Sequence, residues 1–377
     1  MKLIVMFLEA HQPRRLSNFR YQDIGIRENY FWDEKNKEII KRISQNSYIP
    51  TLSLLKDYSV PITLSFSGIL LEQLWKYEPT VPDLLKEYFK ASGGEMAIES
   101  YYHSLSSIWN PERFLNEVRK DMDIKKEIYD KDFRTFRNTE MIYSDKIDEI
   151  VNQLNVKNIL TEGTDSIISK YNPNFIYKTP FGHNIFLRNY RLSDDISFRF
   201  SNREWNEYPL FSEKYLNWLS NSPGDLINLF MDFETFGEHQ RKETGIFEFL
   251  EAFIERAKDY NLKFATVNEA AESITPRGQI SIKEYISWAD IPRDMSAWLG
   301  NELQKDLFEI LKSLEKCIPE EIYNYLLTSD HLYYVSLGTT PDITVHSYFN
   351  PYGSAYDAYI NFRNILEDLR LRYCNGN

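Results

Sequence analysis

The order of apolar and polar positions divides the chain into alternating strand-like and helix-like segments up to about residue 266. Two of the strand-like runs, Leu3 to Leu8 and Leu226 to Met231, are apolar on both faces, which is typical of parallel strands covered on both sides. The predicted strands are Leu3 to Leu8, Ile62 to Phe66, Glu95 to Ile98, Phe133 to Arg137, Val156 to Leu160, Asn184 to Leu187, Leu226 to Met231 and Phe264 to Val267. The predicted helices are Val81 to Lys90, Pro111 to Tyr129, Ser144 to Leu154 and Gly245 to Tyr260. This alternation of strands and helices indicates an α/β fold.

The pattern changes from about Ile280, where apolar positions recur at helical intervals. Leu307, Ile310 and Leu311 have this spacing, and Tyr356 to Leu371 has the pattern of a final amphipathic helix. We therefore expect an α/β domain over residues 1–276 and a helical region over residues 277–377 that packs on it.

Polar side chains that suit a site follow the predicted strands rather than the helices. His11 follows the first strand, Glu99 and His103 follow the third, Glu140 follows the fourth and Asp232 follows the seventh. In a β/α barrel the chemistry sits on loops after the strands, whereas a doubly wound sheet binds its ligand at one crevice. Candidates at several separate strand ends favour the barrel, and no glycine-rich nucleotide-binding sequence follows a predicted strand.

Asp232 and Glu234 stand at the end of the apolar run Leu226 to Met231. Residues two apart on a strand point to the same face, so the two carboxyl groups are expected to project together. Like charges raise each other's pKa, so one of the two tends to keep its proton and to act as a general acid near neutral pH. The alternative is a structural pair that binds backbone amides.

Glu140 and His11 are two further candidates at strand ends. Arg137 and Tyr143 flank Glu140 in the sequence, which favours an ionised glutamate that acts as a nucleophile. The alternative for Glu140 is a solvated loop residue. Pro13 keeps the residue before it extended, so His11 is expected to donate a hydrogen bond to a substrate hydroxyl. A lone histidine after a strand is, however, more often structural.

Two other groups of residues are expected to border a pocket. Glu99 and His103 follow the same strand, and the place of Glu95 relative to Glu99 stays open. Trp288 and Trp298, in the helical region, are expected to border a cleft, where aromatic faces stack on the apolar faces of sugar rings.

No metal ion and no organic cofactor is expected. His11, His103, His239, Asp232 and Glu238 form the one conceivable ligand set. No His-x-His, His-x-x-x-His or cysteine pair supports a metal centre built from them.

Composition and charge restrict the classes of partner. The 377 residues, 42% of them apolar, are enough for one large domain with an appendage or for two domains. The net charge of -12 disfavours nucleic acids and anionic membranes but not a neutral sugar.

No uncharged stretch approaches the roughly 20 residues that span a bilayer, and the N-terminal apolar run is too short for a signal peptide, so a cytoplasmic location is predicted. In that reducing compartment Cys317 and Cys374 are expected to be free thiols. The oligomeric state is not readable.

Several segments resemble glycoside hydrolase family 57, in particular its α-amylase-type members. The segments that carry the resemblance are His11-Gln12-Pro13, Glu95 through Leu105, Phe136 through Tyr143, and Asp232 through Gln240, which are similar to the family's first four conserved segments in that order. Arg191 to Phe200 and Trp288 to Asn301 also resemble the amylase-type members.

The resemblance implies an incomplete (β/α)7 TIM-like barrel followed by a C-terminal helical bundle. It implies a retaining mechanism on α-glucans or maltooligosaccharides, with Glu140 as the nucleophile and Asp232 as the general acid/base, about 5–5.5 Å apart. It further implies that sugar hydroxyls are bound by His11, Glu99, His103, Glu234 and His239, with a contribution from Asp294.

Three other functions compete with an α-amylase-like hydrolase. A 4-α-glucanotransferase or a branching enzyme uses the same chemistry with a sugar hydroxyl in place of water. A non-catalytic glucan-binding protein is disfavoured because both carboxylates are present. A metal-dependent sugar deacetylase or mannosidase on a related barrel would need a metal site.

Overall fold

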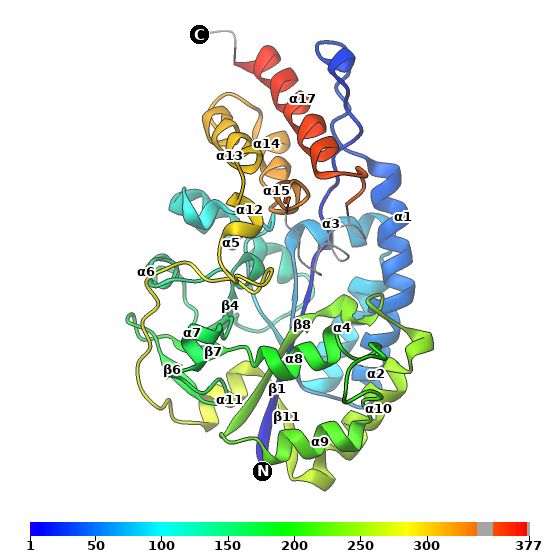
Figure 1. The fold of residues 1–377 in the computed structure, drawn as a ribbon, viewed down its shortest axis with the longest axis vertical. Coiled ribbons are helices and arrows are strands. Elements are labelled where there is room, and N and C mark those ends of the chain that lie inside the picture. The colour runs from blue at the N-terminus through cyan, green and yellow to red at the C-terminus, as the bar shows by residue number, and fades with distance from the viewer. Residues whose placement is uncertain (338–349, 375–377) are drawn as a thin grey trace.

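The computed structural model describes residues 1–337 and 350–374 of the chain. Figure 1 shows the strands in one half of an elongated molecule and the last helices of the chain in the other half. The N-terminus lies at the strand end, and the last helix, α17 (Ala355–Tyr373), lies at the opposite end.

Strand β1 (Lys2–Ala10) is the centre of a five-stranded parallel sheet. One edge of β1 pairs with β8 (Leu226–Asp232) from Leu3 to Glu9. The other edge pairs first with β11 (Leu262–Ala265) and then with β2 (Thr63–Phe66), and β2 pairs with β3 (Glu95–Met96). Because β1 is covered on both faces, seven of its nine residues are buried.

A second sheet has the order β4 (Thr135–Arg137), β5 (Asn158–Thr161), β7 (Asn184–Leu187) and β6 (Ile176–Lys178). Its first three strands are parallel, and β6 is antiparallel to β7. A parallel bridge between Ile98 and Phe136 joins β3 to β4. At the other edge, Asn189 N donates to Asn228 O (3.0 Å), which links the end of β7 to β8. The two sheets are therefore joined between β3 and β4 and again between the end of β7 and β8.

The predicted α/β fold with a parallel sheet is confirmed. Each of the eight predicted strands coincides with or overlaps an observed strand. Three short strands were not predicted: β6, which has three residues, and β9 (Phe236–Gly237) and β10 (Gln240–Arg241), which have two each. Such short pieces carry too few positions for a period of two to be recognised.

Helices cover the outer faces of the strands and share one large apolar core with them. The predicted helices are observed as α4 (Thr80–Ser92), α5 (Pro111–Lys125), α6 (Asp145–Val151) and α10 (Ile246–Arg256), each within a few residues of the expected bounds. The helices of this part are α1 (Asp33–Ile43), α2 (Ile49–Asp57), α3 (Gly68–Tyr77), α4 (Thr80–Ser92), α5 (Pro111–Lys125), α6 (Asp145–Val151), α7 (Asp165–Ile168), α8 (Tyr190–Ser197), α9 (Ser212–Asn221), α10 (Ile246–Arg256) and α11 (Val267–Ser273).

The later helices have an apolar core of their own, which includes Leu307, Leu326 and Leu366. Leu16 and Phe19, from the segment after β1, belong to this second core, so the N-terminal part of the chain contributes to the helical layer. The helices are α12 (Ser296–Leu299), α13 (Glu302–Leu314), α14 (Glu320–Leu326), α15 (Asp330–Tyr333) and α17. Among the described residues, no helix has both the length and the apolar character needed to cross a bilayer.

The prediction that Cys317 and Cys374 are free thiols is wrong, because the structure pairs them in a disulfide. Their Cα atoms lie 5.3 Å apart although 57 positions separate them in the sequence. Cys317 follows α13 and Cys374 follows α17, and these two helices pack side by side. The pairing depends on this packing, which no local pattern in the sequence reports.

Candidate active site

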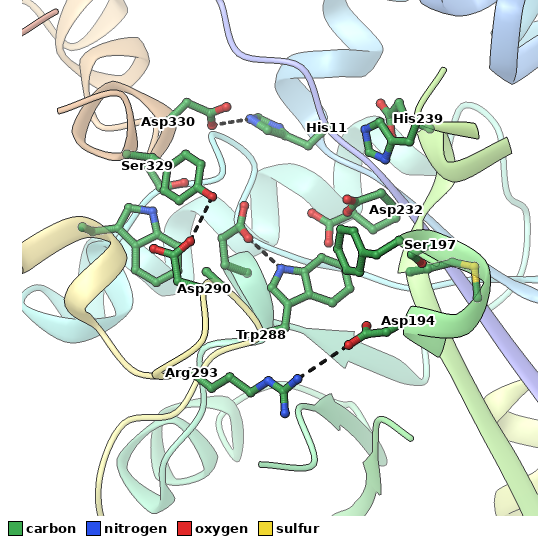
Figure 2. A pocket seen from close by; sticks show the side chains of 18 of the residues that line it. His11, Asp194, Ser197, Asp232, His239, Trp288, Asp290, Arg293, Ser329 and Asp330 are labelled. Carbon is green, nitrogen blue, oxygen red and sulfur yellow. Dashed lines mark hydrogen bonds and ion pairs between the residues drawn. The ribbon is translucent and has the colours of Figure 1, made fainter. Parts of the chain in front are cut away.

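A cavity of about 410 Å³ opens where the carboxyl ends of the parallel strands face the helical layer. Its lining includes Glu140, Arg188 and Asp232, from the ends of β4, β7 and β8, together with Trp288 and Asp330. Figure 2 shows Asp232, Trp288 and Asp330 around the cavity. The predicted nucleophile and the predicted acid/base therefore line the same cavity although they come from different strands.

Glu140 stands in a 3-10 turn, Thr139–Met141, that follows β4. The backbone φ angles of Glu140 and Met141 are 54° and 56°, in the left-handed region that residues with side chains rarely adopt. Two hydrogen bonds hold the turn: Thr139 Oγ1 donates to Ser104 O (2.8 Å), and Trp288 N donates to Glu140 O (3.1 Å). Such strain persists only where the surroundings over-determine it, and it is concentrated at functional sites.

The carboxylate of Glu140 is held ionised by two donors. His103 Nε2 lies 3.0 Å from Oε1, and Trp288 Nε1 donates to Oε2 (2.6 Å). Burial opposes the charge, but these hydrogen bonds, together with the charges of His103 and Arg137, outweigh it and lower the pKa of Glu140. The side chain is still 27% exposed, so a ligand in the cavity can reach it.

His103 is a fully buried cation behind Glu140. Burial lowers its pKa, but hydrogen bonds to Glu140 and to Glu99 Oε2 (3.3 Å) outweigh that effect and raise the pKa to about 10. The His11 ring stacks on it, with centroids 3.8 Å apart. Glu99 is itself fully buried and also accepts from Arg137 Nη1 (3.1 Å).

Glu99 and His103 therefore lie in a layer behind the cavity wall, where the sequence analysis expected direct contact with a ligand. His103 orients the Glu140 carboxylate and keeps it ionised through one hydrogen bond, and Glu99 holds His103 through another. The open question about Glu95 is resolved in the same way. It lies lower in the sheet and accepts from Thr63 and Thr135.

Asp232 and Glu234 both line the cavity, as expected, but not as strand neighbours. Strand β8 ends at Asp232, and Glu234 lies in the 3-10 turn Phe233–Thr235. Burial, and then the charge of Glu140, raise the pKa of Asp232 to about 6. Burial and the charge of Asp232 raise the pKa of Glu234 to about 8, although Tyr48 and Gln12 donate to it. At neutral pH Glu234 is accordingly a neutral acid.

His11 joins the strand region to the helical layer. Its Nδ1 lies 2.7 Å from Ser67 Oγ, and its Nε2 lies 2.9 Å from Asp330 Oδ2, at the start of α15. Burial favours the neutral form of Asp330, but His11, His103 and His331 outweigh this effect and hold the pKa of Asp330 well below its usual range. Sequence reasoning missed Asp330, since it stands 319 positions from His11 with no motif around it.

The predicted aromatic residues lie at the cavity, whereas Asp294 does not. Two guanidinium groups lie near the Trp288 ring, with Arg137 5.5 Å and Arg188 5.7 Å from its centroid. Trp298 lines the cavity but is only 1% exposed. Asp294 is exposed and accepts a hydrogen bond from Ser296 N (2.8 Å), at the first residue of α12. The acid that this loop places in the cavity is Asp290, four positions earlier.

His239 lines the cavity, as do Asp232 and Glu234. Figure 2 shows His239 near Asp232. Burial lowers its pKa to about 4, so its ring is neutral at physiological pH. A neutral ring both donates and accepts a hydrogen bond, which suits contact with a hydroxyl group.

A row of alternating charges along one wall was also missed. Arg188 pairs with Glu162 (2.9 Å) and with Asp194 (2.5 Å), and Asp194 also pairs with Arg293 (3.7 Å). Arg188, Asp194 and Arg293 line the cavity. The sequence signals were the place of Arg188 directly after a predicted strand, and the presence of Asp194 and Arg293 in the two segments that resemble amylase-type members.

The grouped histidines and acids are poorly arranged for a metal ion. Among the described residues, His11, His103 and Asp330 have ligand atoms within 4.8 Å of one another. The two imidazole rings are stacked 11° from parallel, so their in-plane lone pairs do not converge on one point. Both nitrogens of His103 already face the carboxylates of Glu99 and Glu140. The absence of a metal stays a prediction.

Comparison with known proteins gives a consistent picture. The model of Glycosyl hydrolase family 57 matches residues 5–283 of the chain. A curated protein of Methanocaldococcus jannaschii, named "Putative alpha-amylase", is 41% identical over 394 residues, which cover 97% of this chain and 84% of that protein.

Solved structures with a similar fold include three enzymes. A 4-alpha-glucanotransferase from Thermococcus litoralis has a TM-score of 0.64 at 17% identity, covering 98% of this chain and 60% of that chain. The alpha-amylase AmyC from Thermotoga maritima has a TM-score of 0.59 at 14% identity, covering 98% and 96%. A GH57-type branching enzyme from Thermococcus kodakaraensis has a TM-score of 0.64 at 12% identity, covering 96% and 89%. This chain spans about 60% of the length of the glucanotransferase chain, and at these identities the likeness concerns the fold alone.

Proposed function

Because the chain belongs to glycosyl hydrolase family 57, we propose that it cleaves α-1,4-glucosidic bonds in α-glucans with retention of anomeric configuration. The observation that carries this proposal is the pairing of Glu140 and Asp232 in one cavity with opposite pKa shifts. One carboxyl group that is ionised and a second that keeps its proton up to about pH 6 are what a glycosidase needs.

In the first step the ionised Glu140 attacks the anomeric carbon of the bound glucan. The glycosidic C–O bond breaks, and the proton of Asp232 passes to the departing oxygen. The hydrogen bonds from His103 Nε2 and Trp288 Nε1 to Glu140 weaken in this step, because the carboxylate loses its negative charge when the ester forms. We expect the two carboxyl groups to act about 5–5.5 Å apart.

In the second step Asp232, now ionised, takes a proton from water. The water oxygen forms a bond to the anomeric carbon, and the ester bond to Glu140 breaks. His11, His239 and the neutral acid Glu234 line the cavity and are proposed to bind sugar hydroxyls beside the cleaved bond. Trp288 is proposed as the apolar contact for the ring faces, whereas Trp298 is too deeply buried for that role. Asp290 takes the place that was expected for Asp294.

The pH dependence of kcat/KM should report these two acids. Asp232 must hold its proton in the first step, so activity is present below its pKa and is lost as the pH rises through about 6. The acidic limb should lie below the ordinary glutamate range, because the pKa of Glu140 is lowered. The measurement is kcat/KM on a maltooligosaccharide between pH 3 and pH 9. This range extends about three pH units on each side of the pKa of Asp232, about 6. Glu234→Gln is the control: it keeps a neutral side chain and should leave the alkaline limb in place, whereas loss of that limb would assign it to Glu234.

The acceptor decides between hydrolysis and transfer. We expect incubation with a single maltooligosaccharide to give mainly shorter products, which is the result for a hydrolase. Products longer than the substrate would instead support the second candidate, a 4-α-glucanotransferase or branching enzyme. The fold likeness to enzymes of both kinds favours neither.

Two other classes are separated by simple controls. A non-catalytic glucan-binding protein would give no products with the unaltered chain. A metal-dependent deacetylase or mannosidase would lose activity in excess chelator, whereas the proposed mechanism leaves it unchanged.

The arrangement of the chain is part of the proposal. The two larger sheets hold eight parallel strands, and we take seven of them, β1, β2, β3, β4, β5, β7 and β8, as an incomplete (β/α)7 TIM-like barrel over residues 1–276. The eighth, β11, pairs with the start of β1. Residues 277–377 are taken as the helical region that closes the site. A cytoplasmic location stays a prediction from the sequence.

A further inference from the structure

Two large apolar side chains stand exposed at the edge of the active-site cavity. Phe198 is 52% exposed and Ile291 is 65% exposed. Among the exposed large hydrophobic residues of the described chain, these two line the cavity. Exposed apolar area beside a polar, charged site is typical of a surface that a ligand covers.

A network of charges holds the two segments that carry them. Phe198 directly follows α8, and Ile291 lies in the loop that leads to α12. Arg293, two positions after Ile291, pairs with Asp194 on α8 (3.7 Å), and its guanidinium lies 3.6 Å from the ring centroid of Tyr190. Arg293 and Asp194 are mostly buried, with side chains 16% and 12% exposed, so the segments are fixed relative to each other.

The position of Phe198 assigns it to the Asp232 side of the site. Helix α8 packs on β8, where Phe230 N donates to Ser193 Oγ (3.2 Å), and β8 ends at Asp232. Figure 2 shows Asp194, Ser197 and Asp232 on the same side of the cavity. A general acid must approach the departing oxygen, so residues beside it face the sugar that leaves in the first step. In the second step the same place is open to an acceptor.

We propose that Phe198 and Ile291 form the acceptor platform of this enzyme, on which the apolar face of a glucan ring rests. The inference rests on the proposed function and deepens it, because an occupied platform favours transfer over hydrolysis. In that step a hydroxyl oxygen of the bound sugar forms a bond to the anomeric carbon. Its proton passes to Asp232, and the ester bond to Glu140 breaks and restores the carboxylate. With the platform empty, water reacts in the same way and gives a reducing sugar.

A glycosyl fluoride isolates this step. Maltotriosyl α-fluoride as donor has no sugar on the leaving side, so formation of the ester does not need the platform. With maltose or maltotriose added as acceptor, the ratio of transfer product to hydrolysis product then measures acceptor binding alone.

Phe198→Ala should lower this ratio by about three- to tenfold, the range expected for the loss of one aromatic contact. The rate of fluoride release without acceptor should be unchanged. Phe198→Trp, which keeps an aromatic face, should restore the ratio. Phe211→Ala is the matched control, because Phe211 is 62% exposed at the start of α9, outside the cavity lining. Since Phe198 is exposed, truncation should leave the unfolding temperature close to that of the unaltered protein.

The outcomes separate the inference from the proposed function. An active enzyme whose product ratio is the same with Phe198→Ala and Phe211→Ala overturns the platform. A ratio that falls only because fluoride release itself falls would place Phe198 in the donor site, which also overturns it. An unaltered protein that releases no fluoride and cleaves no glucan overturns the proposed function first.

Discussion

Glu140→Gln should reduce kcat on maltooligosaccharides by roughly 10⁴- to 10⁶-fold, because the amide cannot form the glycosyl ester. The side chain keeps its size and still accepts the hydrogen bond that Trp288 Nε1 donates to Oε2. Glucan binding should therefore be largely spared, which isothermal calorimetry or retardation in a glucan-containing gel would measure. Turnover within tenfold of the unaltered enzyme would remove Glu140 from the role of nucleophile.

A second variant, Glu140→Ala, tests the role of Glu140 as nucleophile through the configuration of a product. Glu140→Ala opens space behind the anomeric carbon, where added azide can attack in place of the carboxylate. Because azide would enter from the nucleophile's side, the expected product from an α-glycosyl fluoride is the β-glycosyl azide. Glu149→Gln is the matched control, since Glu149 is an exposed glutamate of α6 outside the cavity lining. It should leave kcat unchanged.

Asp232→Asn should reduce kcat/KM on natural glucans by about 10²- to 10⁴-fold, because the departing oxygen is then not protonated. The loss should depend on the leaving group. An α-glycosyl fluoride needs no proton, so a burst of fluoride equal to about one enzyme equivalent is expected before hydrolysis of the ester limits turnover. Rapid-quench fluoride release and mass spectrometry of the trapped ester, located at Glu140, provide the measurement.

The opposite result would assign the proton transfer elsewhere. If Asp232→Asn slowed glucans and fluorides equally, the side chain would hold the substrate rather than donate a proton. Azide again separates the roles: with Asp232→Ala it should give the α-glycosyl azide, of opposite configuration to the product with Glu140→Ala. Asp57→Asn, an exposed aspartate of α2, is the matched control.

The raised pKa of Asp232 and the lowered pKa of Glu140 arise from tertiary contacts. From the sequence, one of the two carboxyl groups of Asp232 and Glu234 was expected to keep its proton and to act as the general acid. In the structure Glu234 has the higher pKa of the two, about 8, because it is buried beside Asp232. Glu140 is ionised chiefly by His103, which a second buried carboxylate, Glu99, helps to keep protonated. The order of the pKa values of these acids could not be predicted from their spacing in the sequence, since each pKa depends on burial and on partners from other strands.

By itself, the sequence determined the alternation of strands and helices and the residues that stand at strand ends, including Glu140 and Asp232. Hydrophobic periodicity is local, and parallel strands bring their carboxyl ends to one edge, so these inferences need no knowledge of distant contacts. Only the tertiary structure decided that Asp330 meets His11, that Cys317 pairs with Cys374 and that Asp290 rather than Asp294 reaches the cavity. It also decided that Phe198 and Ile291 stay uncovered. These features depend on how loops and the last helices pack over the strands, and packing joins positions that no period or motif connects.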